Sequence, residues 1–130
     1  MAGEPLENIY FSPLRNVHMS YGVETSEHDP VITSSPDDKR LYVGQNFTFE
    51  VSFKAFKGPV KIKVWIINSD GEKKKLHSKG KGFIRSAVFP IEIHGVTKQH
   101  AGTYIVKIKD KGISKKHGNS ARASWTVDVW

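Results

Sequence analysis

Six histidines are the residues of this chain with the most obvious chemical capacity, because histidine can ligate a metal or transfer a proton near neutral pH. They are His18, His28, His77, His94, His100 and His117. They form no HExxH pair or other close ligand spacing, and the chain has no cysteine to complete a zinc site. It also has no GxSxG motif, no phosphate-binding loop and no carboxylate pair in an apolar setting. We therefore expect no catalytic residue, no metal site, no cofactor and no enzymatic activity.

The distribution of charge is a more informative chemical feature. The chain has a formal net charge of +7. Residues 1–50 hold 3 Lys+Arg against 8 Asp+Glu, and residues 51–130 hold 17 against 5, so the total is the sum of −5 and +12. The basic part attracts acidic surfaces in general. Specific nucleic-acid binding also needs exposed aromatic residues among the basic ones, and most aromatic residues here alternate toward one face, so we do not predict it.

Period-two alternation of apolar residues dominates after residue 40 and predicts five strands. The apolar positions are Phe47, Phe49, Val51 and Phe53; Ile62, Val64 and Ile66; Phe89, Ile91 and Ile93; Tyr104, Val106 and Ile108; and Ala123, Trp125, Val127 and Val129. Strands with one apolar and one wet face must pair their apolar faces, which predicts an all-β antiparallel sandwich. The parity places Trp65 on the wet face, so either a bulge re-aims it or Trp125 fills the core.

Turn-forming residues separate these strands and set the organisation of the chain. We predict turns at Lys57–Pro59, Asn68–Glu72, Lys79–Gly82, Gly95–Gly102 and Lys116–Ser120, with a short helical turn within Thr97–His100. A chain of 130 residues fits one domain. Residues 1–40 are predicted to be an irregular N-terminal segment of that domain with an edge strand or strands, and residues 41–130 to be the sandwich core.

The stretch GVTKQHAGTYIVKI resembles the end of strand E through strand F of immunoglobulin-like domains, whose pattern is D-x-G-x-Y-x-C. Gly102 and Tyr104 match this pattern, whereas His100 and Val106 replace the acid and the cysteine. FPIEI, VGQNFTFEVSF and VKIKVWI resemble strands E, B and C. The resemblance implies a variable-type or intermediate-type sandwich of about 7–9 strands without the usual disulfide, and a structural tyrosine corner at Tyr104. Filamin-like and bacterial immunoglobulin-like sandwiches remain alternatives.

The same resemblance implies a binding face, because strands C and F are neighbours in one sheet of immunoglobulin-like domains. The outward residues predicted to bind a partner are Lys61, Lys63, Trp65, Lys107 and Lys109. An exposed tryptophan among lysines is a suitable anchor for an acidic protein surface. The alternative is that the lysines only solvate the sheet and that Trp65 lies in the core.

The sequence gives fewer indications of the cellular compartment and of the binding partner. Asn46-Phe47-Thr48 is an N-glycosylation sequon at the start of a predicted strand. The N-terminus has no signal-peptide pattern, and no apolar run spans a bilayer. We predict a recognition domain of a cell-surface adhesion or self-recognition protein, similar to allorecognition domains of colonial invertebrates, with an acidic or identical partner. The alternative is a cytoplasmic structural module similar to sarcomeric immunoglobulin repeats. A third reading is a bacterial or viral carbohydrate-binding sandwich.

Overall fold

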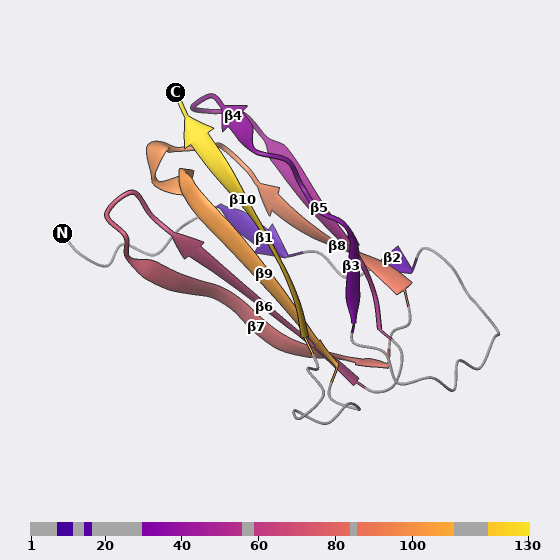
Figure 1. Cartoon of the computed structure of the whole chain (residues 1–130). Helices are drawn as coiled ribbons and strands as arrows, with labels where there is room; N and C mark the ends of the chain where they lie inside the picture. Colours follow the sequence, from indigo (N-terminus) through magenta and orange to yellow (C-terminus); the bar gives the residue numbers. More distant parts are fainter. Residues whose placement is uncertain (1–7, 12–14, 17–29, 56–58, 84–85, 111–119) are drawn as a thin grey trace.

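The computed structural model describes residues 8–11, 15–16, 30–55, 59–83, 86–110 and 120–130. Within this part of the chain, ten β-segments and one short 3₁₀ helix follow one another (Figure 1). They are β1 (Ile9–Phe11), β2 (Arg15–Asn16), β3 (Val31–Ser34), β4 (Lys39–Leu41), β5 (Phe47–Lys54), β6 (Pro59–Ile67), β7 (Lys73–Phe83), β8 (Ser86–Ile93), η1 (Lys98–His100), β9 (Gly102–Asp110) and β10 (Ser120–Val129).

Two five-stranded sheets form the two layers of a sandwich (Figure 1). The first has the order β1-β8-β5-β3, with β2 also paired to β8, and the second has the order β4-β10-β9-β6-β7. β4 runs parallel to β10, and the other described pairs are antiparallel. Because β1 and β2 lie one after the other along β8, the sandwich has nine strand positions. This confirms the predicted all-β immunoglobulin-like sandwich.

The core lies between the sheets and is formed mainly by apolar residues that alternate along the five predicted strands, with Leu41, Ala55 and Val96 added from outside that alternation. Burial of each such side chain contributes roughly 1.5–3 kcal/mol to folding. Trp125 is 2% exposed, and its ring stacks on that of Tyr104 at 5.8 Å between centroids and tilts against Phe49 at 5.4 Å. Trp65 is partly exposed on the opposite face of β6, whereas Ile62 and Ile66 are buried. Trp125 on β10 therefore fills the core, and Trp65 does not.

The longest strand, β7, was not predicted, and the predicted turn at Lys79–Gly82 was wrong because those residues lie within it. Among the described strands, β7 pairs with β6 alone, and its register shifts twice, between Val60 and Lys61 and between Val64 and Trp65. At each shift β7 contains one more residue than the facing part of β6, as in a β-bulge. The bulges break the strict alternation by which a strand is recognised in a sequence.

The predicted turn at Asn68–Glu72 joins β6 to β7. Its backbone closes with hydrogen bonds from Asn68 N–H to the Glu72 carbonyl oxygen at 3.0 Å and from Gly71 N–H to the Asn68 carbonyl oxygen at 2.9 Å. The Asn68 side-chain oxygen accepts hydrogen bonds from the backbone N–H groups of Asp70 and Glu72, both at 3.0 Å. An asparagine that organises the backbone after it in this way is a frequent turn residue.

The acidic N-terminal residues supply strands to both sheets. β3 pairs with β5 and β4 pairs with β10, while β1 and β2 lie on the outer edge of β8 (Figure 1). In immunoglobulin-like domains this position beside strand E belongs to strand D, which lies between strands C and E in the chain. Here β8 occupies the place of strand E. The strands beside it, β1 and β2, precede all the other described strands in the sequence.

A proline of β8 lies between the residues that pair with β1 and those that pair with β2. Phe11 pairs with Ile91 and Arg15 with Val88, so Pro90 lies along β8 between the two short pairings. Proline has no backbone N–H to give to a neighbouring strand. Pro90 nevertheless pairs in register with Glu50 of β5 on the inner side.

Candidate protein-binding face and strand F corner

The predicted partner-binding residues lie together on the outward face of the second sheet. On β6 and β9, Lys61 is directly opposite Lys109, and Lys63 is directly opposite Lys107. Arg122 of β10 is opposite Lys107 on its other side, which extends the second row. All four lysines are partly exposed, and Arg122 is exposed. Like charges placed directly across a strand pair oppose folding, so the sheet carries an electrostatic cost at this position.

The electrostatic effect is evident in the pKa of Lys63, which is lowered from its ordinary value of 10.5. The ammonium of Lys61 contributes most to this decrease, and desolvation comes next. Lys75, Lys107 and Lys109 lower the pKa further. A positive potential from several directions makes a site that favours a nearby carboxylate.

The other end of the face is apolar. Trp65 is directly opposite Ile105 on β9 and Lys75 on β7, and the next row opposes Ile67 to Thr103. The ammonium of Lys73 lies over the Trp65 ring, 4.7 Å from its centroid, as a cation–π pair. A partly exposed indole beside a row of cations offers both an apolar anchor and charge.

We call this surface the basic face, and its rows run across β10, β9, β6 and β7. It comprises Lys61, Lys63, Trp65, Ile67, Lys73, Lys75, Ile105, Lys107, Lys109 and Arg122. Four rows of paired residues cross this face, one through each of the β6 residues Lys61, Lys63, Trp65 and Ile67. Among the described residues paired in these rows there is no aspartate or glutamate. Lys73, Lys75 and Arg122 were not predicted to lie on this face. The first two belong to β7, whose residues follow no apolar alternation, and Arg122 lies one residue before the alternation recognised in β10.

The strand F corner is built by Tyr104 and His100. The buried Tyr104 hydroxyl donates a hydrogen bond to the His100 carbonyl oxygen at 2.7 Å. His100 Nδ1 accepts a hydrogen bond from the backbone N–H of Thr97 at 2.8 Å, which caps η1. A histidine at the position of the usual acid can therefore provide the acceptor that caps this turn. The short helical turn predicted within Thr97–His100 corresponds to η1.

We expect Tyr104→Phe to lower the free energy of unfolding by about 2 kcal/mol, because the buried carbonyl oxygen of His100 loses this donor. Urea denaturation followed by tryptophan fluorescence measures the change. Tyr10→Phe is the matched control, because Tyr10 is 52% exposed, and it should change the free energy by less than about 0.5 kcal/mol. Equal effects of the two substitutions would contradict the structural role of the corner.

The same tyrosine predicts a loss of stability in alkali. Burial raises the pKa of Tyr104 above its ordinary value of 10.0, because it disfavours the phenolate. The stabilisation from the neutral phenol is therefore complete below about pH 10 and is lost as the pH rises toward the folded-state pKa. The urea midpoint of the wild-type chain should fall more between about pH 8 and pH 11 than that of Tyr104→Phe. Parallel decreases would show that Tyr104 does not contribute.

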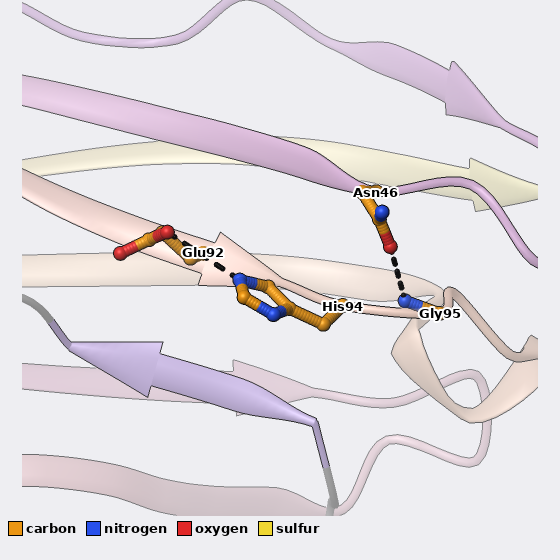
Figure 2. A network of polar contacts seen from close by, with 4 residues as sticks. All are labelled: Asn46, Glu92, His94 and Gly95. Atoms are coloured by element: carbon orange, nitrogen blue, oxygen red, sulfur yellow. Dashed lines mark hydrogen bonds and ion pairs between the residues drawn. The ribbon is translucent and has the colours of Figure 1, made fainter.

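Asn46, the predicted glycosylation residue, is exposed and directly precedes β5. Its side-chain oxygen accepts a hydrogen bond from Gly95 N–H at 2.8 Å, and Figure 2 shows the side chain pointing toward that backbone. A glycan attaches through the amide nitrogen, so this contact leaves the attachment atom for the sugar. The geometry is thus compatible with the sequon.

The described histidines do not gather into one site. His94 is exposed, and its Nε2 lies 3.4 Å from a Glu92 carboxylate oxygen (Figure 2). His77 packs its ring on Phe11 at 4.5 Å, and His100 is in the corner. His18, His28 and His117 are outside the described residues. Among residues 8–11, 15–16, 30–55, 59–83, 86–110 and 120–130, no three histidine, aspartate or glutamate side chains are placed to hold a metal ion.

Comparisons with known proteins give a fold. No protein-family model and no curated protein matches the chain. Among solved structures it is similar to titin M4 in a trigonal form, at 24% identity and a TM-score of 0.55 over 82% of this chain and 100% of that chain. A mutated three-domain fragment of titin, I67-I69, aligns at 18% identity and a TM-score of 0.56, over 80% of this chain and 33% of the fragment.

A third similar structure concerns T cell specificity and activation by the bacterial superantigen toxic shock syndrome toxin-1. Its chain aligns at 7% identity and a TM-score of 0.60, over 78% of this chain and 99% of that one. Within the described residues, no helix has the length and apolar character needed to cross a bilayer. These likenesses and the strand order agree that the chain is an immunoglobulin-like β-sandwich domain, free of cysteine and structurally similar to titin immunoglobulin repeats.

Proposed function

We propose that this domain is a non-enzymatic structural module of the muscle or cytoskeletal type, and that its basic face docks on an acidic protein surface. The solved structures of similar fold that favour this reading are titin domains. Disulfides are rare in the reducing cytosol, and a chain without cysteine suits that compartment. The adhesion function predicted from sequence receives no comparable support.

The observation that carries the proposal is the pairing of lysines across β6 and β9. Lys61 lies opposite Lys109 and Lys63 lies opposite Lys107, and the neighbouring ammonium groups lower the pKa of Lys63. A partner that brings carboxylates to these two rows removes the repulsion and gains charge-assisted hydrogen bonds. Lysines that merely keep a sheet wet need no such concentration, because alternating signs would solvate it without the cost.

The apolar end of the face supports a protein partner over a simple polyanion. Trp65 and Ile105 lie next to the lysine rows, and a docked protein can bury them. Aromatic anchors contribute much of the affinity of protein interfaces, while peripheral charges mainly raise the association rate. A filament or neighbouring module with acidic residues around an apolar depression has the required chemistry.

We expect Lys107→Glu/Lys109→Glu to weaken binding of poly-L-glutamate at least about tenfold, which is 1.4 kcal/mol. Isothermal titration at low salt measures the affinity, and circular dichroism checks that the domain remains folded. The control is Lys54→Glu/Lys98→Glu, which replaces two exposed lysines away from the basic face. Both variants lower the net charge from +7 to +3, because each replacement removes two units.

Equal weakening by the two double variants would show that only net charge matters, and would refute the basic face as a site. Heparin and duplex DNA serve as competing polyanions in the same titrations. Tighter binding of either one than of the acidic polypeptide, with the same dependence on Lys107 and Lys109, would replace the protein partner by that class.

A second candidate function is cell-surface adhesion or self-recognition, and the exposed Asn46 sequon favours it. Mass spectrometry of the Asn46 peptide from the natural source distinguishes the compartments. A glycan on Asn46 would place the domain in the secretory pathway and eliminate the cytoskeletal module. The basic face would then be tested as a contact between cells.

A further inference from the structure

The outer edge of β8 is covered by an unusual occupant. β7 ends at Phe83 and β8 begins at Ser86, so too few residues remain between them for a strand in the place of strand D. Ile9–Phe11 and Arg15–Asn16 lie there instead (Figure 1). An uncovered edge strand presents unpaired N–H and C=O groups that bind other strands. The N-terminal segment therefore closes an edge that the rest of the domain leaves open.

The contacts of β1 define what this edge binds. Ile9 and Phe11 are partly buried against the core, and the Phe11 ring lies 5.8 Å from that of Phe89 in a stacked arrangement. Tyr10 lies between them, 52% exposed, and pairs with Glu92. The edge thus accepts an extended antiparallel segment of three residues. The first is apolar and the third is aromatic, and both face the core, while the second faces outward. Recognition through backbone pairing and alternate side chains is typical of strand addition.

We propose that the outer edge of β8 is a strand-binding site that takes the β1–β2 segment of a second copy of this chain in exchange for its own. Among the described residues, five pairs join β1 and β2 to β8, against eight pairs between β5 and β8. In the sequence, thirteen residues separate Asn16 from Pro30. An identical segment from another copy makes the same contacts, so exchange adds no unfavourable contact within the site.

Concentration decides which copy supplies the segment. A tethered segment competes with an effective concentration on the order of millimolar, so the segment stays on its own β8 in dilute solution. Exchange increases as the protein concentration approaches that value or as copies are held side by side. The product is a reciprocal dimer in which each copy completes the first sheet of the other.

The absence of cysteine from these 130 residues allows a direct test. Tyr10 and Glu92 are directly opposite each other in an antiparallel pair, whose Cα spacing is within the range that a disulfide bridges. A chain carrying Tyr10→Cys is mixed with a chain carrying Glu92→Cys at high concentration, oxidised mildly and analysed by non-reducing electrophoresis. We expect a disulfide-linked heterodimer, since only exchange brings the two thiols together in register.

The matched control replaces Tyr10→Cys by Tyr42→Cys, because Tyr42 is similarly exposed, at 59%, but lies outside β1. The exchanging pair should cross-link about tenfold faster than this pair, in proportion to the raised local concentration. Adding Phe11→Asp to the Tyr10→Cys chain should remove the difference. The double variant Tyr10→Cys/Glu92→Cys reports whether β1 lies on β8 of its own chain.

Two outcomes would overturn the proposal. If the double variant forms its internal disulfide but the mixed single variants cross-link no faster than the control, the segment does not exchange between copies. If the double variant forms no internal disulfide, the outer edge of β8 does not bind β1.

Discussion

Gly102→Ala is expected to lower the free energy of unfolding by about 4 kcal/mol, a large part of the 5–15 kcal/mol typical of a domain. Gly102 has a φ of +149°, which L side chains rarely adopt. A Cβ atom built there would clash with the backbone carbonyl oxygen of Ile67 and lie 3.2 Å from Ile66 Cγ1. Backbone cannot move aside as a flexible side chain does, so β9 would have to separate from β6 at this point.

Gly71→Ala separates the two causes of this loss. Gly71 also has a positive φ, +83°, but a Cβ atom there would have no neighbour within 4 Å. Its substitution should cost only the backbone strain of about 1–2 kcal/mol. Urea denaturation of both variants gives the comparison, with unchanged m values showing that the unfolded states are alike. A loss at Gly102 no larger than that at Gly71 would mean that the approach to Ile67 is not tight.

Trp125→Ala is expected to cost about 3–5 kcal/mol, because it removes a fully buried indole from between the sheets. The ring packs on Tyr104 and Phe49, so its loss leaves a cavity beside the strand F corner. Trp65→Ala should cost only about 1 kcal/mol, the size of a partly exposed cation–π contact with Lys73. Chemical denaturation of the two variants tests this asymmetry.

The effects of the two tryptophan substitutions on partner binding should be in the reverse order of their effects on stability. Trp65→Ala removes the apolar anchor of the basic face and should weaken docking to a protein partner, while the domain stays folded. The stability assignment is wrong if Trp65→Ala destabilises the domain as much as Trp125→Ala. In that case Trp65 would be a core residue, as the tryptophan of strand C is in the family.

The alternation of apolar residues was enough to predict β5, β6, β8, β9 and β10. Each of these strands has one face in the core, and burial enforces a period of two along the chain. The same parity placed Trp65 on the outward face of its strand but left open a bulge that would turn it inward. In the structure Trp65 is partly exposed, while Ile62 and Ile66 are buried. The alignment of Lys61 and Lys63 with Lys107 and Lys109 on one outward face was then predictable, because neighbouring strands of known parity align their outward residues.

The strand β7 was not predictable in this way. It is an edge strand that pairs with β6 alone, and two bulges interrupt its register. Its glycines and lysines follow no apolar period, because partial burial at an edge places little demand on side chains. Backbone hydrogen bonds to β6 decide its conformation, and they leave no mark on residue type.

The amino-acid sequence by itself determined which faces of five strands enter the core, and its resemblance to strand F of immunoglobulin-like domains indicated Tyr104 as the corner residue. Both depend on side chains close together in the chain. Only the tertiary structure decided that Trp125 fills the core and that Ile9–Phe11 covers β8. Tyr10 and Glu92 are far apart in the sequence, and backbone groups of any residue type can pair. Which segment covers an open edge therefore depends on which edges the rest of the fold leaves free.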